Sequence, residues 1–148
     1  MDTRHFEPEV ARIDWMGKTW RFANVSINDA LLNKTVYDYE FEHVFHDREN
    51  PARSAGGYIS QFAKELVAQI TDPEQREESE YVALLICTCT HEGCGSFVVR
   101  MEETDEHVLW FDFHNPAQEK ERYHEFGSFT FDKKQFWSAV ERLGSHDI

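Results

Sequence analysis

The sequence predicts an α+β fold: a single domain with an antiparallel sheet of about six strands and two main helices, one of them C-terminal. Residues 81–87 are almost continuously apolar and contain no Gly or Pro, which is typical of a buried strand. Several other segments alternate between apolar and polar residues and flank short turns, as in antiparallel hairpins. Two further segments repeat apolar residues every three or four positions, which predicts helices that cover part of the sheet.

Composition restricts the class of protein. The 148 residues include 12 Phe, 5 Tyr and 4 Trp, which is enough apolar surface for the core of one domain. Residues 1–9 are polar and are expected to be flexible, which leaves 10–148 as the domain. The formal net charge of −13 disfavours nucleic acid and anionic membrane surfaces as partners, because both require clustered Lys and Arg.

The N-terminal half predicts strands. Val10–Trp15 and Thr19–Ile27 flank a short turn and predict a hairpin, with Trp20 and Phe22 on one face. Val36–Phe45 alternates between aromatic and acidic residues, which predicts a half-solvated strand whose exposed edge could pair with a second copy. A polar loop is expected at 46–57.

The central part predicts a helix and a three-stranded meander. Tyr58–Ile70 carries apolar residues at helical spacing, and the helix is expected to end before Pro73. The meander is expected from the segments Tyr81–Cys87, Phe97–Met101 and His107–Phe113.

The last helix has the clearest local signals. Asp132 is placed to cap its N-terminus, and Gln135 completes a capping box. Phe131 and Phe136 occupy the positions of a hydrophobic staple, and Gly144 is expected to form a left-handed C-cap.

All three cysteines lie within nine residues. Cys87 and Cys89 are expected on one face of a strand, and Cys94 lies in a turn with two glycines. Three interpretations stay open: buried reduced thiols, a structural zinc site, or a reactive thiol. The zinc site would use Cys87, Cys89 and Cys94 with His91 as the fourth ligand, although C-x-C-x4-C is not the common C-x2-C knuckle.

No recognisable catalytic set occurs in the sequence. It contains no P-loop, no G-x-G-x-x-G and no G-x-S-x-G nucleophile elbow. It also contains no apolar run long enough to span a membrane and no signal-peptide core. An odd number of close cysteines without an export signal predicts a cytoplasmic protein.

Four short motifs carry a resemblance. They are C-x-C-x3-G-C-G at Cys87–Gly95, Val-Val-Arg at 98–100, V-x-W-x-D-F at Val108–Phe113 and F-x-F-D-x2-Q-F at Phe129–Phe136. Together they resemble a family of small uncharacterised bacterial proteins, over roughly residues 81–143. The resemblance implies a stand-alone bacterial cytosolic protein and no particular activity.

The sequence therefore favours a non-enzymatic protein-interaction module whose cysteine hairpin could bind structural zinc. The acidic charge indicates a basic protein partner. One alternative is an immunity or antitoxin-like partner of a basic toxin. Another is a thiol-dependent enzyme or redox protein that uses Cys89 or Cys94. The sequence predicts no oligomeric state.

Overall fold

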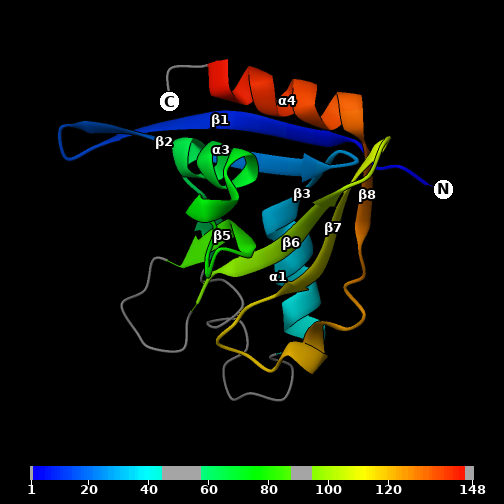
Figure 1. Cartoon of the computed structure of the whole chain (residues 1–148). Helices are drawn as coiled ribbons and strands as arrows, with labels where there is room; N and C mark the ends of the chain where they lie inside the picture. The colour runs from blue at the N-terminus through cyan, green and yellow to red at the C-terminus, as the bar shows by residue number, and fades with distance from the viewer. Residues whose placement is uncertain (1, 45–57, 88–94, 146–148) are drawn as a thin grey trace.

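The computed structural model describes residues 2–44, 58–87 and 95–145. Within these ranges the chain has the α+β fold that the sequence predicts, with antiparallel sheets of three and five strands and three α-helices (Figure 1). None of the described helices is both long and apolar enough to cross a membrane. The predicted polar loop at 46–57 lies outside the described residues.

The first sheet is built on a long hairpin of β1 (Phe6–Trp15) and β2 (Lys18–Ile27). β1 begins earlier than the predicted start at Val10, because Phe6 is a fully buried core residue. The short strand β3 (Ala30–Leu31) pairs with the end of β2. Figure 1 shows that the tip of the hairpin projects beyond the other described elements.

The predicted strand at Val36–Phe45 is wrong, because its residues up to His43 belong to helix α1 (Leu32–His43), while Phe45 lies outside the described residues. The helix therefore offers no strand edge to a second copy. Its buried side chains recur at every fourth position: Leu32, Val36 and Glu40. The aromatic residues that alternate along the sequence stack in pairs four residues apart, Tyr37 on Phe41 and Tyr39 on His43.

The predicted helix at Tyr58–Ile70 is two elements. Its first residues form strand β4 (Tyr58–Ser60), and helix α3 covers Ala63–Thr71. The helix ends before Pro73 as predicted. The Asp72 side chain then accepts a hydrogen bond at the start of a 3₁₀ turn, η1 (Pro73–Gln75).

The predicted meander is confirmed. It consists of β5 (Tyr81–Cys87), β6 (Phe97–Glu103) and β7 (His107–His114). Strand β8 (Phe129–Asp132) follows a 3₁₀ turn, η2 (Lys120–Tyr123), and completes the order β4-β5-β6-β7-β8. The described residues form eight strands instead of the expected six. The short strands β3, β4 and β8 carry too few residues to show a pattern, and one expected strand is helix α1.

Helix α4 (Lys133–Ser145) closes the described chain. Its predicted N-cap is confirmed, because the backbone N–H of Gln135 donates to the Asp132 carboxylate at 3.0 Å. The left-handed C-cap predicted at Gly144 is wrong. Gly144 lies within the helix and has no positive φ, because the helix continues to Ser145.

An aromatic cluster joins the two sheets to α4. The ring of Phe6 lies 5.4 Å from Trp110, 5.7 Å from Phe131 and 4.7 Å from Phe136, measured between ring centroids. All four side chains are fully buried. The predicted staple is part of this cluster, with Phe131 and Phe136 5.4 Å apart. Phe6 therefore anchors the base of the projecting hairpin in the core.

Candidate functional site

The cysteine hairpin is the site that the sequence predicts, and only its first member is described. Cys87 is the last residue of β5, is partly buried and is disulfide-bonded. Cys89, His91 and Cys94 lie outside the described residues, so the grouping of the four side chains stays a prediction. Zinc binds cysteine as a thiolate, so a disulfide at Cys87 and a zinc ion at Cys87 exclude each other. Within the described ranges no group of three or more His, Cys, Asp or Glu could hold a metal ion.

A thiol count separates the disulfide from the zinc site. We expect protein purified without reductant to have one free thiol per chain, because the disulfide at Cys87 consumes two of the three cysteines. A zinc site predicts about one zinc per chain in reduced protein, with thiols that stay blocked until chelation. Thiol titration and elemental analysis of the same sample measure both quantities. Three free thiols and no metal in protein purified without reductant would contradict both the disulfide and the zinc site.

A buried polar network surrounds Glu40 on α1. The Oε2 atom of Glu40 accepts hydrogen bonds from the hydroxyls of Tyr58 at 2.7 Å and Tyr123 at 2.5 Å. The side-chain amide of Asn115 donates to the Tyr58 hydroxyl at 2.7 Å. The Oε1 atom is buried and has no hydrogen-bond partner among the described residues. The network therefore ties α1 to β4, to η2 and to the residue that follows β7.

The burial of Glu40 determines its protonation. Burial raises the pKa of Glu40 to about 7, although the hydrogen bonds from Tyr123 and Tyr58 act in the opposite direction. Burial, and then the charge of Glu40, also raise the pKa of both tyrosines. A carboxyl group that titrates near neutrality can serve in acid–base catalysis. Glu40, however, has no exposed surface, so it cannot contact a substrate directly.

A second polar cluster surrounds Asp112 on β7, where the pairing of β6 and β7 shifts register. Asp112 has a φ of +60°, an uncommon conformation that Asp tolerates better than most residues. Its carboxylate pairs with Lys120 at 2.8 Å, and this hydrogen bond raises the pKa of Lys120. Arg100 lies 3.8 Å from the same carboxylate and also pairs with Glu80. Because these charges neutralise one another, the cluster fastens η2 to the sheet and offers no activated group.

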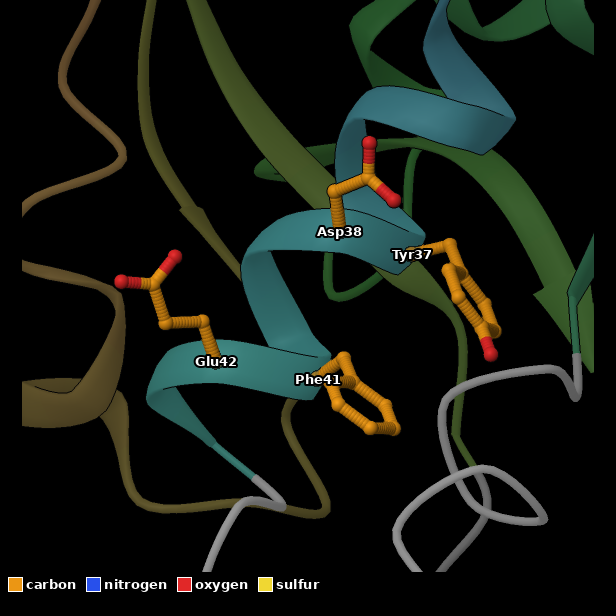
Figure 2. Close-up of a pocket in the computed structure, with 4 residues that line it drawn as sticks. All are labelled: Tyr37, Asp38, Phe41 and Glu42. Carbon is orange, nitrogen blue, oxygen red and sulfur yellow. The ribbon is translucent and has the colours of Figure 1, made fainter.

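A shallow depression lies on the exposed face of α1 (Figure 2). Tyr37 and Phe41 project from the helix side by side, whereas Asp38 and Glu42 point elsewhere. Asp38 is paired with Lys34 at 2.9 Å. Among the described residues one helix supplies the lining and no polar groups converge on a common point, so this part of the depression lacks the features of a small-molecule site.

The β1–β2 hairpin carries the most exposed apolar side chains of the described chain. Ile13 is 52% exposed, Trp15 63% and Met16 80%. Residues that pair across two strands share a face, so Ile13 lies beside Trp20. The apolar surface then continues to Phe62 at the start of α3, whose ring lies 5.8 Å from Trp20 and 5.1 Å from Phe22. We call this surface the hairpin patch: Ile13, Trp15, Met16, Trp20, Phe22 and Phe62.

The turn of the hairpin contains an apolar residue, Met16, in a backbone conformation that Met does not favour. Met16 and Gly17 form a two-residue connection with φ values of +52° and +72°. Asn or Gly is preferred at such positions, and other L-residues are destabilised there by roughly 1–2 kcal/mol. Met16 is also the most exposed member of the hairpin patch. Neither backbone conformation nor burial within the chain explains this methionine.

The comparisons with known proteins gave no match: no family model matches the chain, and neither a curated protein nor a solved structure matches it. Function is therefore inferred from this chain's own residues. The sequence placed Trp20 and Phe22 on one face but did not identify the hairpin patch. The unusual Met-Gly turn is the signal that could have indicated it.

Proposed function

We propose that the protein is a non-enzymatic protein-interaction module and that the hairpin patch is its contact surface. The observation that carries the proposal is the exposure of Ile13, Trp15 and Met16 at the tip of a projecting hairpin. Contiguous exposed apolar surface is typical of protein contact sites, and aromatic residues contribute much of the binding energy at such sites. A methionine adapts its shape readily to a partner surface.

The charge of the chain indicates the chemistry of the partner. The formal net charge is −13, and the end of β6 and the turn that follows it expose four acidic side chains: Glu102, Glu103, Asp105 and Glu106. A basic protein would be attracted by this field, and its association would be faster at low salt. An immunity or antitoxin-like role would be one instance of such binding, with a basic toxin as partner.

The two polar clusters support a role without catalysis. Glu40 is fully buried, and the carboxylate of Asp112 is engaged by Lys120 and Arg100. Both clusters hold η2 in place. Asp112 and Lys120 line an open cavity of about 330 Å³ beside η2, but they are paired with each other. Thiol chemistry at Cys89 or Cys94 is the competing proposal, and the thiol titration described above bears on it.

The Met16→Asn substitution tests the contribution of Met16 to binding without lowering the stability of the fold. Asn adopts positive φ more readily than Met, so we expect M16N to leave the free energy of unfolding unchanged or to raise it by up to about 1 kcal/mol. We expect the same variant, combined with I13T, to weaken binding of a protein partner about tenfold or more. The partner would be isolated from extract of the source cells, identified, purified, and titrated by calorimetry.

Phe41→Ala is the matched control, because Phe41 is 43% exposed but lies outside the hairpin patch. The Phe41→Ala variant should bind the purified partner with wild-type affinity. Equal affinity of the wild type and the M16N/I13T variant would show that the hairpin patch is not the contact surface.

A further inference from the structure

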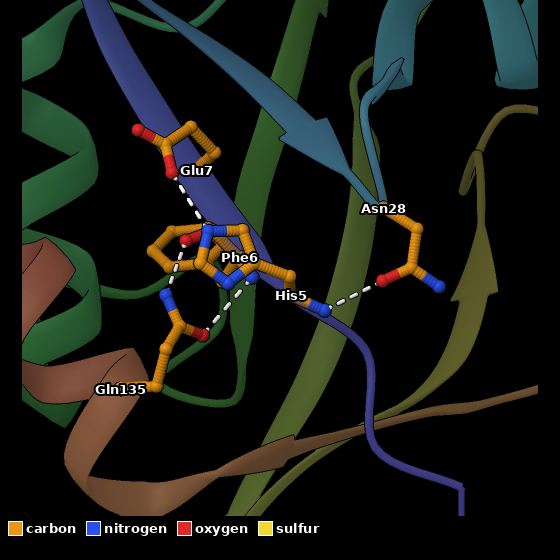
Figure 3. Close-up of polar contacts among 5 residues, drawn as sticks. All are labelled: His5, Phe6, Glu7, Asn28 and Gln135. Carbon is orange, nitrogen blue, oxygen red and sulfur yellow. Dashed lines mark hydrogen bonds and ion pairs between the residues drawn. The ribbon is translucent and has the colours of Figure 1, made fainter.

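Among the described residues β1 has a strand neighbour, β2, on one side, and the contacts of Phe6 define which backbone groups the other edge presents. The backbone N–H of Phe6 donates to the side-chain oxygen of Gln135 at 3.0 Å, and the Gln135 amide donates to the Phe6 carbonyl at 2.7 Å (Figure 3). Both backbone groups of Phe6 therefore point away from β2. Backbone direction alternates along a strand that has one antiparallel neighbour. Consequently Val10, Arg12 and Asp14 also direct their N–H and C=O groups away from β2.

The open part of this edge is limited to the outer half of β1. Gln135 closes the edge at Phe6, and Pro8 has no N–H to donate. In the described part of the chain no strand pairs with the remaining stretch on this side. A groove of about 470 Å³ lies where α4 passes β1, and its lining includes Val10, Arg12, Arg142 and Leu143. An unpaired strand edge of this kind is a template for pairing with another chain.

We propose that the occupant is a second copy of this chain, whose β1 pairs antiparallel with the first around a two-fold axis at Ile13. This inference rests on the proposed function, because it uses the hairpin as the contact surface. In this register Ile13 lies opposite its own copy. Arg12 lies opposite Asp14 of the second copy, and their outward backbone groups form hydrogen bonds on both sides of the axis.

The side chains select this register over its neighbours. Two Arg12–Asp14 ion pairs form, one on each side of the axis, and Ala11 faces Trp15 of the second copy. Met16 of the second copy reaches Val10 at the end of the groove. A register centred on Arg12 would place two arginines opposite each other, and one centred on Ala11 would place Glu9 opposite Ile13. Like charges on directly opposed residues destabilise a sheet.

The distribution of charge permits this contact between two acidic chains. The whole chain has a formal net charge of −13, but the hairpin is nearly balanced. Its basic residues are Arg12, Lys18 and Arg21, and its acidic residues from position 9 onward are Glu9 and Asp14. Because the tip projects beyond the other described elements (Figure 1), pairing through the tips keeps the acidic turn between β6 and β7 outside the contact.

The test is sedimentation equilibrium of the full chain and of three charge variants: R12D, D14R and R12D/D14R. Wild-type protein should change from monomer to dimer between about 1 µM and about 1 mM, the range expected for a small interface. Each single exchange places like charges opposite each other at two symmetric positions, so its dissociation constant should rise about tenfold or more. The double exchange should restore association. In the single chain Arg12 already lies opposite Arg21, so R12D should not disturb the hairpin.

Either of two results would overturn the proposal. One is a wild-type chain that stays monomeric throughout this range. The other is association of both single variants with wild-type affinity, which would place the contact elsewhere. Neither result changes the expected effect of M16N/I13T on a different protein partner, so this failure is distinguishable from failure of the proposed function. Thermal unfolding of each variant checks that the fold is kept, and R12D serves alone if D14R fails to fold.

Discussion

Phe6→Ala is expected to lower the free energy of unfolding by about 4 kcal/mol, because it removes a fully buried aromatic side chain and leaves a cavity. The ring packs against Trp110, Phe131 and Phe136, which come from three other elements of the fold. The backbone of Phe6 is also held by Gln135, so the cavity is expected to collapse only partly. Urea unfolding followed by circular dichroism measures the change.

Phe41→Ala is the control of the same chemistry, since Phe41 on α1 is 43% exposed and stacks only on Tyr37 among the described rings. Its loss of stability should stay below about 1 kcal/mol. Similar losses in the two variants would show that Phe6 does not anchor the hairpin in the core.

Glu40→Gln is expected to remove most of a pH dependence of stability near neutrality. The folded state keeps Glu40 protonated up to about pH 7, whereas the unfolded chain ionises this carboxyl near its ordinary value of 4.5. Ionisation therefore favours unfolding. The stabilising contribution is complete in acid and is lost as the pH rises through about 7. The wild type should lose about 2–3 kcal/mol relative to the variant between about pH 5 and about pH 8.

Glutamine is the informative replacement because it keeps an oxygen that can accept from Tyr58 and Tyr123. The measurement is urea unfolding of both proteins at several pH values. Glu42→Gln, on the exposed side of the same helix, controls for the loss of one negative charge. Parallel stability curves for wild type and E40Q would mean that Glu40 ionises normally in the folded protein.

The sequence mispredicted α1 because its aromatic residues satisfy two periods at once. An aromatic residue at every second position also recurs at every fourth position, and four residues is the spacing of neighbours on a helix face. Tyr39 and His43 accordingly stack at 4.4 Å in the helix. The deciding contribution is tertiary, since Val36 and Glu40 are fully buried on one side of the helix, whereas the predicted strand would have placed both on its solvated face with Asp38.

Elements with local signals were predictable. The apolar run of β5 and the glycine-containing approach to β6 indicated the meander, and Asp132 indicated the start of α4. The role of Gln135 was not predictable. It was expected to complete a capping box, but its side chain instead binds the backbone of Phe6, 129 residues away in sequence.

The Glu40 network could not be predicted, because its members come together only through the tertiary fold. Tyr58 is 18 residues and Tyr123 is 83 residues from Glu40 in sequence. Once α1 is recognised as a helix, Glu40 falls on its buried stripe, and this is the only local signal for an unusual carboxyl group. The hairpin patch has a local signal, because Met16 occupies a turn position that favours Asn. This signal can be interpreted only from the structure, which shows that Met16 has a positive φ.

The most direct test of a protein contact at the hairpin is amide hydrogen exchange along β1 of the full chain. The N–H groups of Val10, Arg12 and Asp14 point away from β2, whereas those of Ala11 and Ile13 point toward it. If another chain covers this edge, exchange at the three outward amides should slow as the protein concentration rises or as a purified partner is added. Ala11 and Ile13 should change little. Rapid exchange at Val10, Arg12 and Asp14 at every concentration, and in the presence of a purified partner, would contradict pairing of another chain along this edge of β1.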